Sequence, residues 1–178
     1  MSIYASLPLV NDNSSIRLLT VEPSGRFDAP LICQLGVAQL QPGLAFEALS
    51  YTWGDATSRT RLTVNQNVLE CTNELAKALR WLRTRTSRRT MWIDQLCINQ
   101  NDGQEKEFQI PLMSKIYSSC SRTVIWIGEA DSQSGYILGS LREEKYVDYA
   151  DLSYLLSRSW FRRIWIVQEI ALAPEALI

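Results

Sequence analysis

The sequence predicts an α/β domain with a mostly parallel sheet flanked by helices and an N-terminal β-hairpin extension. From Phe46 onward, short apolar segments typical of buried strands alternate with amphipathic segments typical of helices. Such alternation indicates parallel strands joined by helical connections. The chain has 178 residues, 46% of them hydrophobic, which suits one domain with a substantial core.

Two strand pairs are predicted in the first half of the chain. Residues 16–21 and 31–40 are apolar enough for strands, and the link between them is rich in Pro and Gly, so we expect a hairpin. A short apolar strand at 46–54 follows and ends at a glycine. Residues 61–64 and 67–70 flank a two-residue polar turn and predict a second hairpin.

The middle of the chain predicts a helix between buried strands. Asn73 is a good N-cap for an amphipathic helix that extends to about Leu82, with apolar residues at helical spacing. Residues 91–99 and 123–128 are largely apolar, as expected for strands buried on both faces.

A second helix is predicted from residue 103 to about residue 119. Asp102 has the position of an N-cap, and Glu105 has the spacing of its capping-box partner. Pro111 lies inside this segment, so we expect it to kink the helix or split it in two, because proline lacks a backbone N–H.

The C-terminal third is less regular in sequence. Residues 129–150 are polar and predict a loop, with room for a helical turn near Ile137 to Leu141. A short helix is expected at 151–157, and Ser159 can cap a further helix from Trp160 to about Ala171. Residues 175–178 look like a strand cut off at its start.

Two regions are therefore expected along the chain. Residues 1–45 form a β extension packed on the domain, and residues 46–178 form the domain itself, truncated at its C-terminus. In sheets of this kind, ligands bind at the carboxyl ends of the strands, so residues just after the strands are candidates for a site.

Composition excludes several classes of function. The net charge is −1, which argues against nucleic acid or an anionic membrane as partner, since both need a basic excess. The chain has 0 His, so histidine-based nucleophiles and histidine-ligated zinc are excluded. The 4 Cys form no C-x-x-C pair, and we predict no metal site. No membrane span or secretory signal is apparent, which predicts a cytoplasmic protein.

Three sequence blocks resemble those of the fungal heterokaryon-incompatibility (HET) domain family. They are FEALSYTWG at 46–54, WIDQLCINQ at 92–100 and WFRRIWIVQE at 160–169. The resemblance covers about residues 16–178 and implies a module that triggers programmed cell death upon non-self recognition, commonly at the N-terminal end of a longer protein. Lys106, where arginine is expected, and Pro111 depart from the family pattern and put in doubt a chemical role for their helix.

The same blocks are similar, more distantly, to the TIR domain, a flavodoxin-like signalling fold. Residues 49–55 are similar to the first TIR strand and its loop, and residues 92–96 to the second strand. Trp165 and Glu169 have the W-x-x-x-E spacing of the TIR helix that ends in the catalytic glutamate of NAD-cleaving members. This resemblance implies a TIR/flavodoxin-like sheet and Glu169 as the catalytic carboxylate.

Cleavage of NAD suits a chain without histidine. The nicotinamide leaving group is already cationic, so it needs no protonation, and one carboxylate such as Glu169 can stabilise the oxocarbenium-like transition state. The alternative is that Glu169 only joins a surface ion-pair network with Arg162 and Arg163. We expect Glu169 on a partly exposed helix surface, where its substitution leaves stability almost unchanged.

Other side chains near the strand ends are candidates for binding the substrate. Asp94 could bind ribose hydroxyls, or could simply cap the next turn, and these two interpretations stay open. An aromatic side chain after the first strand of the parallel sheet could stack on adenine or nicotinamide. The expected substrate-binding set is Tyr51, Trp53, Gly54, Asp55, Asp94, Asn99 and Trp165.

The resemblance therefore implies an effector of fungal non-self recognition that hydrolyses NAD or a related nucleotide as substrate, without a bound cofactor. The alternative is a non-catalytic signalling module that recruits cell-death partners through self-association. Either activity suggests a homo-oligomer or partner signalling domains.

Overall fold

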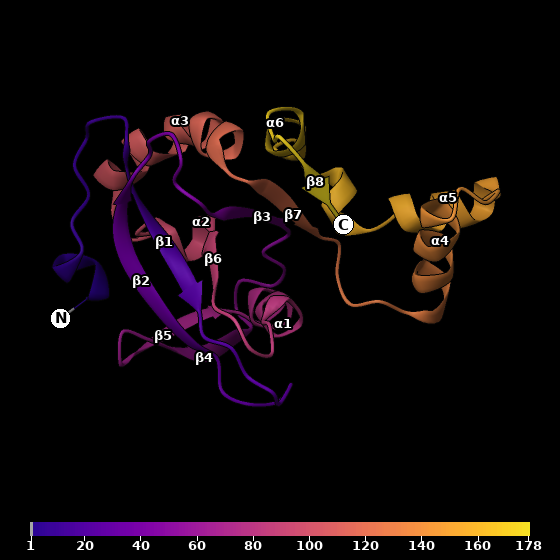
Figure 1. The fold of residues 1–178 in the computed structure, drawn as a ribbon, viewed down its shortest axis with the longest axis horizontal. Coiled ribbons are helices and arrows are strands. Elements are labelled where there is room, and N and C mark those ends of the chain that lie inside the picture. The colour runs from indigo at the N-terminus through magenta and orange to yellow at the C-terminus, as the bar shows by residue number, and fades with distance from the viewer. Residues whose placement is uncertain (1) are drawn as a thin grey trace.

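The computed structural model describes residues 2–178 and confirms the predicted α/β class (Figure 1). One mixed sheet has the strand order β5-β4-β2-β1-β6-β3-β7-β8. The strands are β1 (Ser15–Val21), β2 (Ile32–Gln39), β3 (Glu47–Tyr51), β4 (Arg59–Val64), β5 (Asn67–Thr72), β6 (Arg89–Trp92), β7 (Arg122–Trp126) and β8 (Ala176–Leu177).

Four neighbouring strands form the main parallel part of the sheet, and β2 also pairs in parallel with β4. β3 pairs in parallel with β6 on one side and with β7 on the other, and β7 pairs in parallel with β8. Numbered along the chain, their spatial order is 2-1-3-4, the first four positions of the flavodoxin-like order. The order reverses beside β3, which makes the carboxyl end of β3 the place where such sheets bind ligands.

Both predicted hairpins are present, and they extend the sheet on one side. β1 and β2 pair antiparallel over seven residue pairs from Ser15↔Gln39 to Val21↔Cys33, and β4 pairs antiparallel with β5. β1 also pairs antiparallel with β6, which joins the N-terminal hairpin directly to the parallel strands. β3 is buried along its whole length, as expected for a central strand.

Six α-helices and two 3₁₀ turns are found in the described residues. They are η1 (Ile3–Ser6), α1 (Asn73–Leu82), α2 (Asp94–Cys97), α3 (Gly103–Ser119), α4 (Ser132–Arg142), α5 (Tyr149–Leu156), η2 (Ser159–Arg162) and α6 (Ile166–Ala171). Asp102 caps α3 as predicted, through its side chain and the backbone N–H of Glu105. The N-cap of α1 is Thr72, one residue before the predicted Asn73.

Three expectations about single elements are wrong, and one of the two alternatives for Pro111 is excluded. The strand predicted over 91–99 ends at Trp92, and Asp94 begins the short helix α2. Residues 132–142 form a helix instead of a loop, because a capping box between Asp131 and Ser134 starts it. The helix predicted over 160–171 is broken into η2 and α6. Pro111 does not split α3, which is a single element of 17 residues.

A buried ion pair ties the N-terminal hairpin to α3. The guanidinium of Arg17 donates to both carboxylate oxygens of Glu105, at 2.7 and 2.9 Å, and its side chain is 1% exposed. Arg17 also donates to the backbone carbonyls of Leu7 and Cys97. Glu105 thus pairs across the molecule, whereas the sequence predicted only a local capping role for it.

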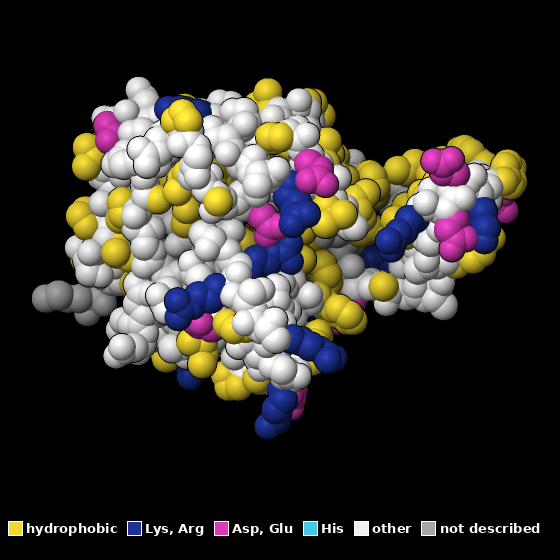
Figure 2. All heavy atoms as spheres, in the orientation of Figure 1, with side chains coloured by type: hydrophobic (Ala, Val, Ile, Leu, Met, Phe, Trp, Pro, Cys, Tyr) yellow, Lys and Arg dark blue, Asp and Glu magenta, His cyan; other side chains and the backbone are white. Residues whose placement is uncertain are grey.

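α4 and α5 pack on each other and project from the sheet (Figures 1 and 2). Arg158, which follows α5, links the end of this helix to the segment that leads from β7 into α4. It donates to the carbonyl oxygens of Ile127 and Glu129 and to the side chains of Asp131 and Ser134. Among residues 2–178, no helix is both long and apolar enough to cross a membrane.

Candidate functional site

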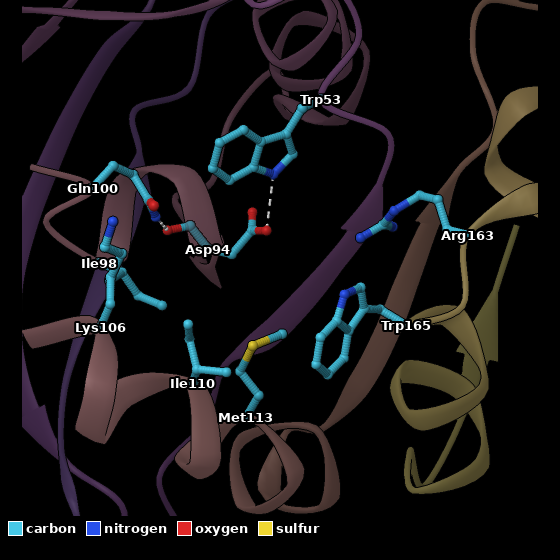
Figure 3. Close-up of a pocket in the computed structure, with 9 residues that line it drawn as sticks. All are labelled: Trp53, Asp94, Ile98, Gln100, Lys106, Ile110, Met113, Arg163 and Trp165. Atoms are coloured by element: carbon cyan, nitrogen blue, oxygen red, sulfur yellow. Dashed lines mark hydrogen bonds between the residues drawn. The ribbon is translucent and has the colours of Figure 1, made fainter. Parts of the chain in front are cut away.

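A cavity of about 220 Å³ lies beside the carboxyl ends of β3 and β6 (Figure 3). Its walls come from the loop after β3, from α2 and the loop after it, from α3, and from the segment between η2 and α6. The lining residues are Trp53, Asp94, Ile98, Gln100, Lys106, Ile110, Met113, Arg163 and Trp165. We call this cavity the tryptophan pocket.

Asp94 carries the carboxylate on the wall of this pocket. The indole N–H of Trp53 donates to its Oδ2 at 2.9 Å, and the backbone N–H of Gln95 donates to its Oδ1 at 2.7 Å. Burial raises the pKa of Asp94 to about 6, although both hydrogen bonds and the nearby Arg163 favour the charged form. The charge of Glu169 adds to the rise, so the two carboxylates interact electrostatically.

Glu169 lies behind the pocket wall and is 2% exposed, so the prediction of a partly exposed position is wrong. Arg163 donates to both of its carboxylate oxygens, at 3.1 and 3.3 Å, and Ser50 donates a further hydrogen bond. The Ser50 hydroxyl in turn accepts from the indole N–H of Trp160 at 2.8 Å. The predicted ion pair with Arg163 therefore exists, but it is buried.

The break between η2 and α6 explains how Arg163 reaches both places. Arg163 directly follows η2 and has extended backbone, and its guanidinium turns back onto Glu169 in α6. The same guanidinium contributes to the tryptophan pocket (Figure 3). Arg163 is thus the link between Glu169 and the pocket.

The structure brings together three of the predicted substrate-binding residues and separates the others. Trp53, Asp94 and Trp165 line the tryptophan pocket. Tyr51 is 1% exposed and belongs to the core, and its hydroxyl has no hydrogen-bond partner among the described residues.

The remaining predicted residues lie outside this pocket. Asp55 is exposed, and its carboxylate accepts from the backbone N–H and the hydroxyl of Thr57, at 2.8 and 2.7 Å. Gly54 lines a separate cavity on the other side of the loop after β3. Asn99 lines a depression near Arg17, and its backbone N–H donates to Glu105 at 2.6 Å.

Sequence reasoning missed several residues of this region. Ser50 carries a polar side chain inside a strand buried throughout, which is the one signal that could have singled it out. Gln100 was not missed, since its place in the 92–100 block predicts a hydrogen bond to loop backbone, and its side-chain amide donates to the Asp94 carbonyl at 2.9 Å. Lys106 lines the pocket although its departure from the family pattern argued against a role.

The chemistry of the pocket suits a flat or cationic ring joined to an anionic group. Two indoles offer faces for stacking, and the Asp94 carboxylate offers a negative charge. Arg163 and Lys106 offer positive charges to phosphate or carboxylate groups. No group of three or more Cys, Asp or Glu side chains arranged for a metal ion occurs within residues 2–178.

Comparison with known sequences decides the family. The profile of the heterokaryon incompatibility protein (HET) family matches residues 46–154, which is more than half of the chain. The chain belongs to the HET family. The HET match includes Trp53, Asp94 and the pocket-lining part of α3, and it ends before Glu169.

A curated relative extends the similarity to both ends of the chain. Heterokaryon incompatibility protein 6, OR allele, of Neurospora crassa is 30% identical over 232 aligned residues, covering 98% of this chain and 34% of the relative. The HET-family chain thus spans about a third of the length of that relative. No solved structure matches this HET-family chain.

Proposed function

We propose that this chain acts in fungal non-self recognition, as a domain that triggers programmed cell death by hydrolysing NAD or a related nucleotide. Membership of the HET family and the incompatibility protein of Neurospora crassa support the cell-death role. The tryptophan pocket supports the nucleotide, since it joins stacking surfaces, a carboxylate and a guanidinium at the carboxyl edge of the sheet.

The observation that carries this proposal is the position of Arg163 between the pocket and Glu169. The nicotinamide ring enters between Trp53 and Trp165, and its positive charge faces Asp94. The diphosphate attracts the Arg163 guanidinium, which then releases the Glu169 carboxylate toward the ribose. Substrate binding and exposure of the catalytic carboxylate are thereby coupled.

The reaction itself needs one carboxylate and water. The bond between the ribose C1′ and the nicotinamide nitrogen breaks, and its electron pair stays with nicotinamide, which leaves as a neutral molecule. The Glu169 carboxylate stabilises the positive charge that develops on the ribose. Water adds at C1′ and loses a proton to solvent, giving ADP-ribose.

The test is release of nicotinamide from NAD by the purified chain, with Glu169→Gln as the variant. Gln keeps the size of the side chain and an oxygen that accepts from Arg163. Turnover is expected to fall by about 10²–10³, the usual cost of losing preorganised electrostatic stabilisation. Glu175→Gln, an exposed charge change in the same C-terminal segment, is the control and should keep full activity. Equal turnover by Glu169→Gln and the unaltered chain would exclude Glu169 as the catalytic group.

Exposed aromatic side chains favour a second candidate function, a non-catalytic module that self-associates. Tyr146 and Tyr149 are 86% and 85% exposed, and Tyr136 is 61% exposed, all in the projecting α4–α5 region. Exposed apolar groups of this density are typical of interaction surfaces. A chain that kills cells without lowering cellular NAD would favour this function over hydrolysis.

A further inference from the structure

A second cavity lies on the other side of the loop after β3, where the strand order reverses between β3 and β7. Its volume is about 160 Å³, and it is lined by Thr52, Gly54, Glu74, Trp126, Ile127, Gly128 and Ser159. This is the switch point at which flavodoxin-like sheets hold their ligands. We call it the switch-point cavity.

In both cavities, a tryptophan indole N–H donates a hydrogen bond to a carboxylate. In the tryptophan pocket the indole N–H of Trp53 donates to Asp94 at 2.9 Å, and in the switch-point cavity the indole N–H of Trp126 donates to Glu74 at 2.8 Å. Each bond occupies one carboxylate oxygen and fixes the carboxylate beside an indole. Only one oxygen of Glu74 is engaged among the described side chains, so the other is available to a ligand.

Two glycines keep this cavity open. Gly54 has φ +70° and Gly128 has φ +104°, conformations that other residues rarely adopt. A Cβ on Gly54 would lie 3.1 Å from the Cβ of Glu74, and a Cβ on Gly128 would lie 3.1 Å from Nη1 of Arg158. Larger residues at either place would therefore press on the groups that frame the cavity.

The donors and acceptors here match a sugar ring better than a base. Thr52 and Ser159 each bring a hydroxyl, Glu74 brings a carboxylate, and Trp126 brings an apolar ring. A carboxylate can accept hydrogen bonds from the hydroxyls of a vicinal diol, and an acidic residue binds the ribose 2′-OH in dinucleotide-binding folds. The cavity is smaller than the roughly 300 Å³ at which pockets for drug-sized ligands begin, so it suits one ring.

We propose that the switch-point cavity binds the vicinal diol of a ribose, with Glu74 as the residue that selects it. This inference rests on the proposed function for the identity of the whole ligand, a nucleotide with two riboses. The loop from Thr52 to Gly54 separates the two cavities, and a dinucleotide crosses it. The nicotinamide end occupies the tryptophan pocket, and the adenosine ribose occupies the switch-point cavity.

The matched indoles provide a direct test. The indole N–H signals of Trp53 and Trp126 are followed by NMR while the Glu169→Gln variant, in which turnover is slowed, is titrated with NAD, which carries both the nicotinamide and the adenosine ribose. Both signals are expected to shift. A shift of Trp53 alone overturns the switch-point assignment and leaves the tryptophan pocket in place. A shift of Trp126 alone supports the diol site and contradicts the proposed function, and no shift at millimolar NAD overturns both.

Selection of the diol is tested with AMP and its 2′-deoxy analogue as probes. AMP should shift the Trp126 signal with at least tenfold higher affinity than 2′-deoxy-AMP. Glu74→Gln, which keeps an acceptor for Trp126, should remove this preference, whereas Glu129→Gln should keep it, because Glu129 pairs with Lys77 outside the cavity lining. Equal affinities for the two nucleotides in the unaltered chain overturn the role of Glu74.

Discussion

Two carboxylates a short distance apart have different environments, and this difference sets their roles. Asp94 faces the tryptophan pocket, and burial outweighs the hydrogen bonds that would favour its charge. Glu169 is more deeply buried, but a guanidinium and a hydroxyl bind its oxygens. Arg163 and Ser50 therefore hold the Glu169 side chain in place, whereas the charge of Asp94 responds to pH.

The raised pKa of Asp94 predicts a pH-dependent effect of Asp94→Asn on stability. Between about pH 4 and pH 6 the folded chain keeps a proton that the unfolded chain loses, so the unaltered protein loses stability as pH rises through this window. Asn cannot ionise and avoids this loss. Between pH 4 and pH 7.5, the free energy of unfolding of the variant should rise by at most about 2–3 kcal/mol relative to that of the unaltered chain. Urea unfolding at several pH values measures this.

Asp55→Asn is the matched control, with the opposite sign. Asp55 accepts hydrogen bonds from Thr57, and these lower its pKa. The charged Asp55 therefore stabilises the folded state above the pKa of the unfolded chain, and this stabilisation is lost as pH falls. Asp55→Asn should thus become relatively less stable as pH rises through about 4. An Asp94→Asn effect that does not change with pH would contradict the raised pKa.

At the scale of elements, Pro111 lies in the middle of α3 on an exposed position. Proline leaves the Glu107 carbonyl without its helical N–H donor and crowds it with the ring. Pro111→Ala should restore this bond and raise the free energy of unfolding by about 1–2 kcal/mol, after allowing for the greater freedom of the unfolded chain. Denaturant unfolding checks the gain, with Ser118→Ala on the same helix as a control expected to stay within about 0.5 kcal/mol. A lower free energy of unfolding in Pro111→Ala would mean that Pro111 stabilises the folded chain at this position.

The ion pair between Arg17 and Glu105 predicts a different response to single and double substitution. Glu105→Leu alone leaves the buried guanidinium without its partner and should cost about 3–5 kcal/mol of unfolding free energy. Arg17→Met combined with Glu105→Leu removes both charges and should recover most of that loss. Thermal unfolding of the single and double variants gives the comparison. A double variant less stable than Glu105→Leu alone would contradict this account.

Sequence patterns predicted the helices and strands well where hydrophobic periodicity was clear. They failed where capping or tertiary burial determines the secondary structure. The hairpins, α1 and α3 follow from alternation and helical spacing. The apolar run after Trp92 fits a strand and a buried helix equally well, so periodicity cannot separate them. Residues 132–142 contain two glycines and three serines, and their helix depends on capping and on burial of Ile137.

The candidate site was predictable to the extent that it follows from the carboxyl edge of the sheet. This rule brought Trp53 and Asp94 together. The burial of Glu169 was not predictable from the sequence. It depends on contacts with Ser50, which lies in β3, and with Arg163, which lies on the other side of the break between η2 and α6. Glu74 was hidden for the same reason, since its indole partner lies in a strand far along the chain.

At the scale of the whole molecule, the N-terminal hairpin lies inside the sheet and not at its edge. β2 pairs with β4, and β1 pairs with β6, so residues 15–39 connect the β4–β5 hairpin to the parallel strands. At the opposite end, β8 and the projecting α4–α5 region leave apolar side chains exposed. The two ends of the sheet therefore differ, and association is expected at the α4–α5 end.

Association at that end can affect the Glu169 carboxylate through the chain itself. α5 leads directly into η2 and then to Arg163, which holds Glu169 in its buried ion pair. A second copy docked on Tyr146 and Tyr149 would shift this segment and make release of Glu169 easier. NAD turnover is therefore expected to rise faster than linearly with protein concentration, measured as nicotinamide released at nanomolar to micromolar chain. Substituting Tyr146→Lys and Tyr149→Lys together should leave only the low, linear rate.

The control for this prediction is Val68→Lys, since Val68 is 69% exposed on β5 at the other edge of the sheet. This variant should keep the steep dependence on concentration, because its added lysine lies far from α5. The thermal unfolding of the tyrosine variants should match that of the unaltered chain, as exposed substitutions usually change stability by about 0.5 kcal/mol or less. Strict proportionality of rate to concentration in the unaltered chain would mean that one copy opens its own site, and Arg163 would then be displaced by substrate alone.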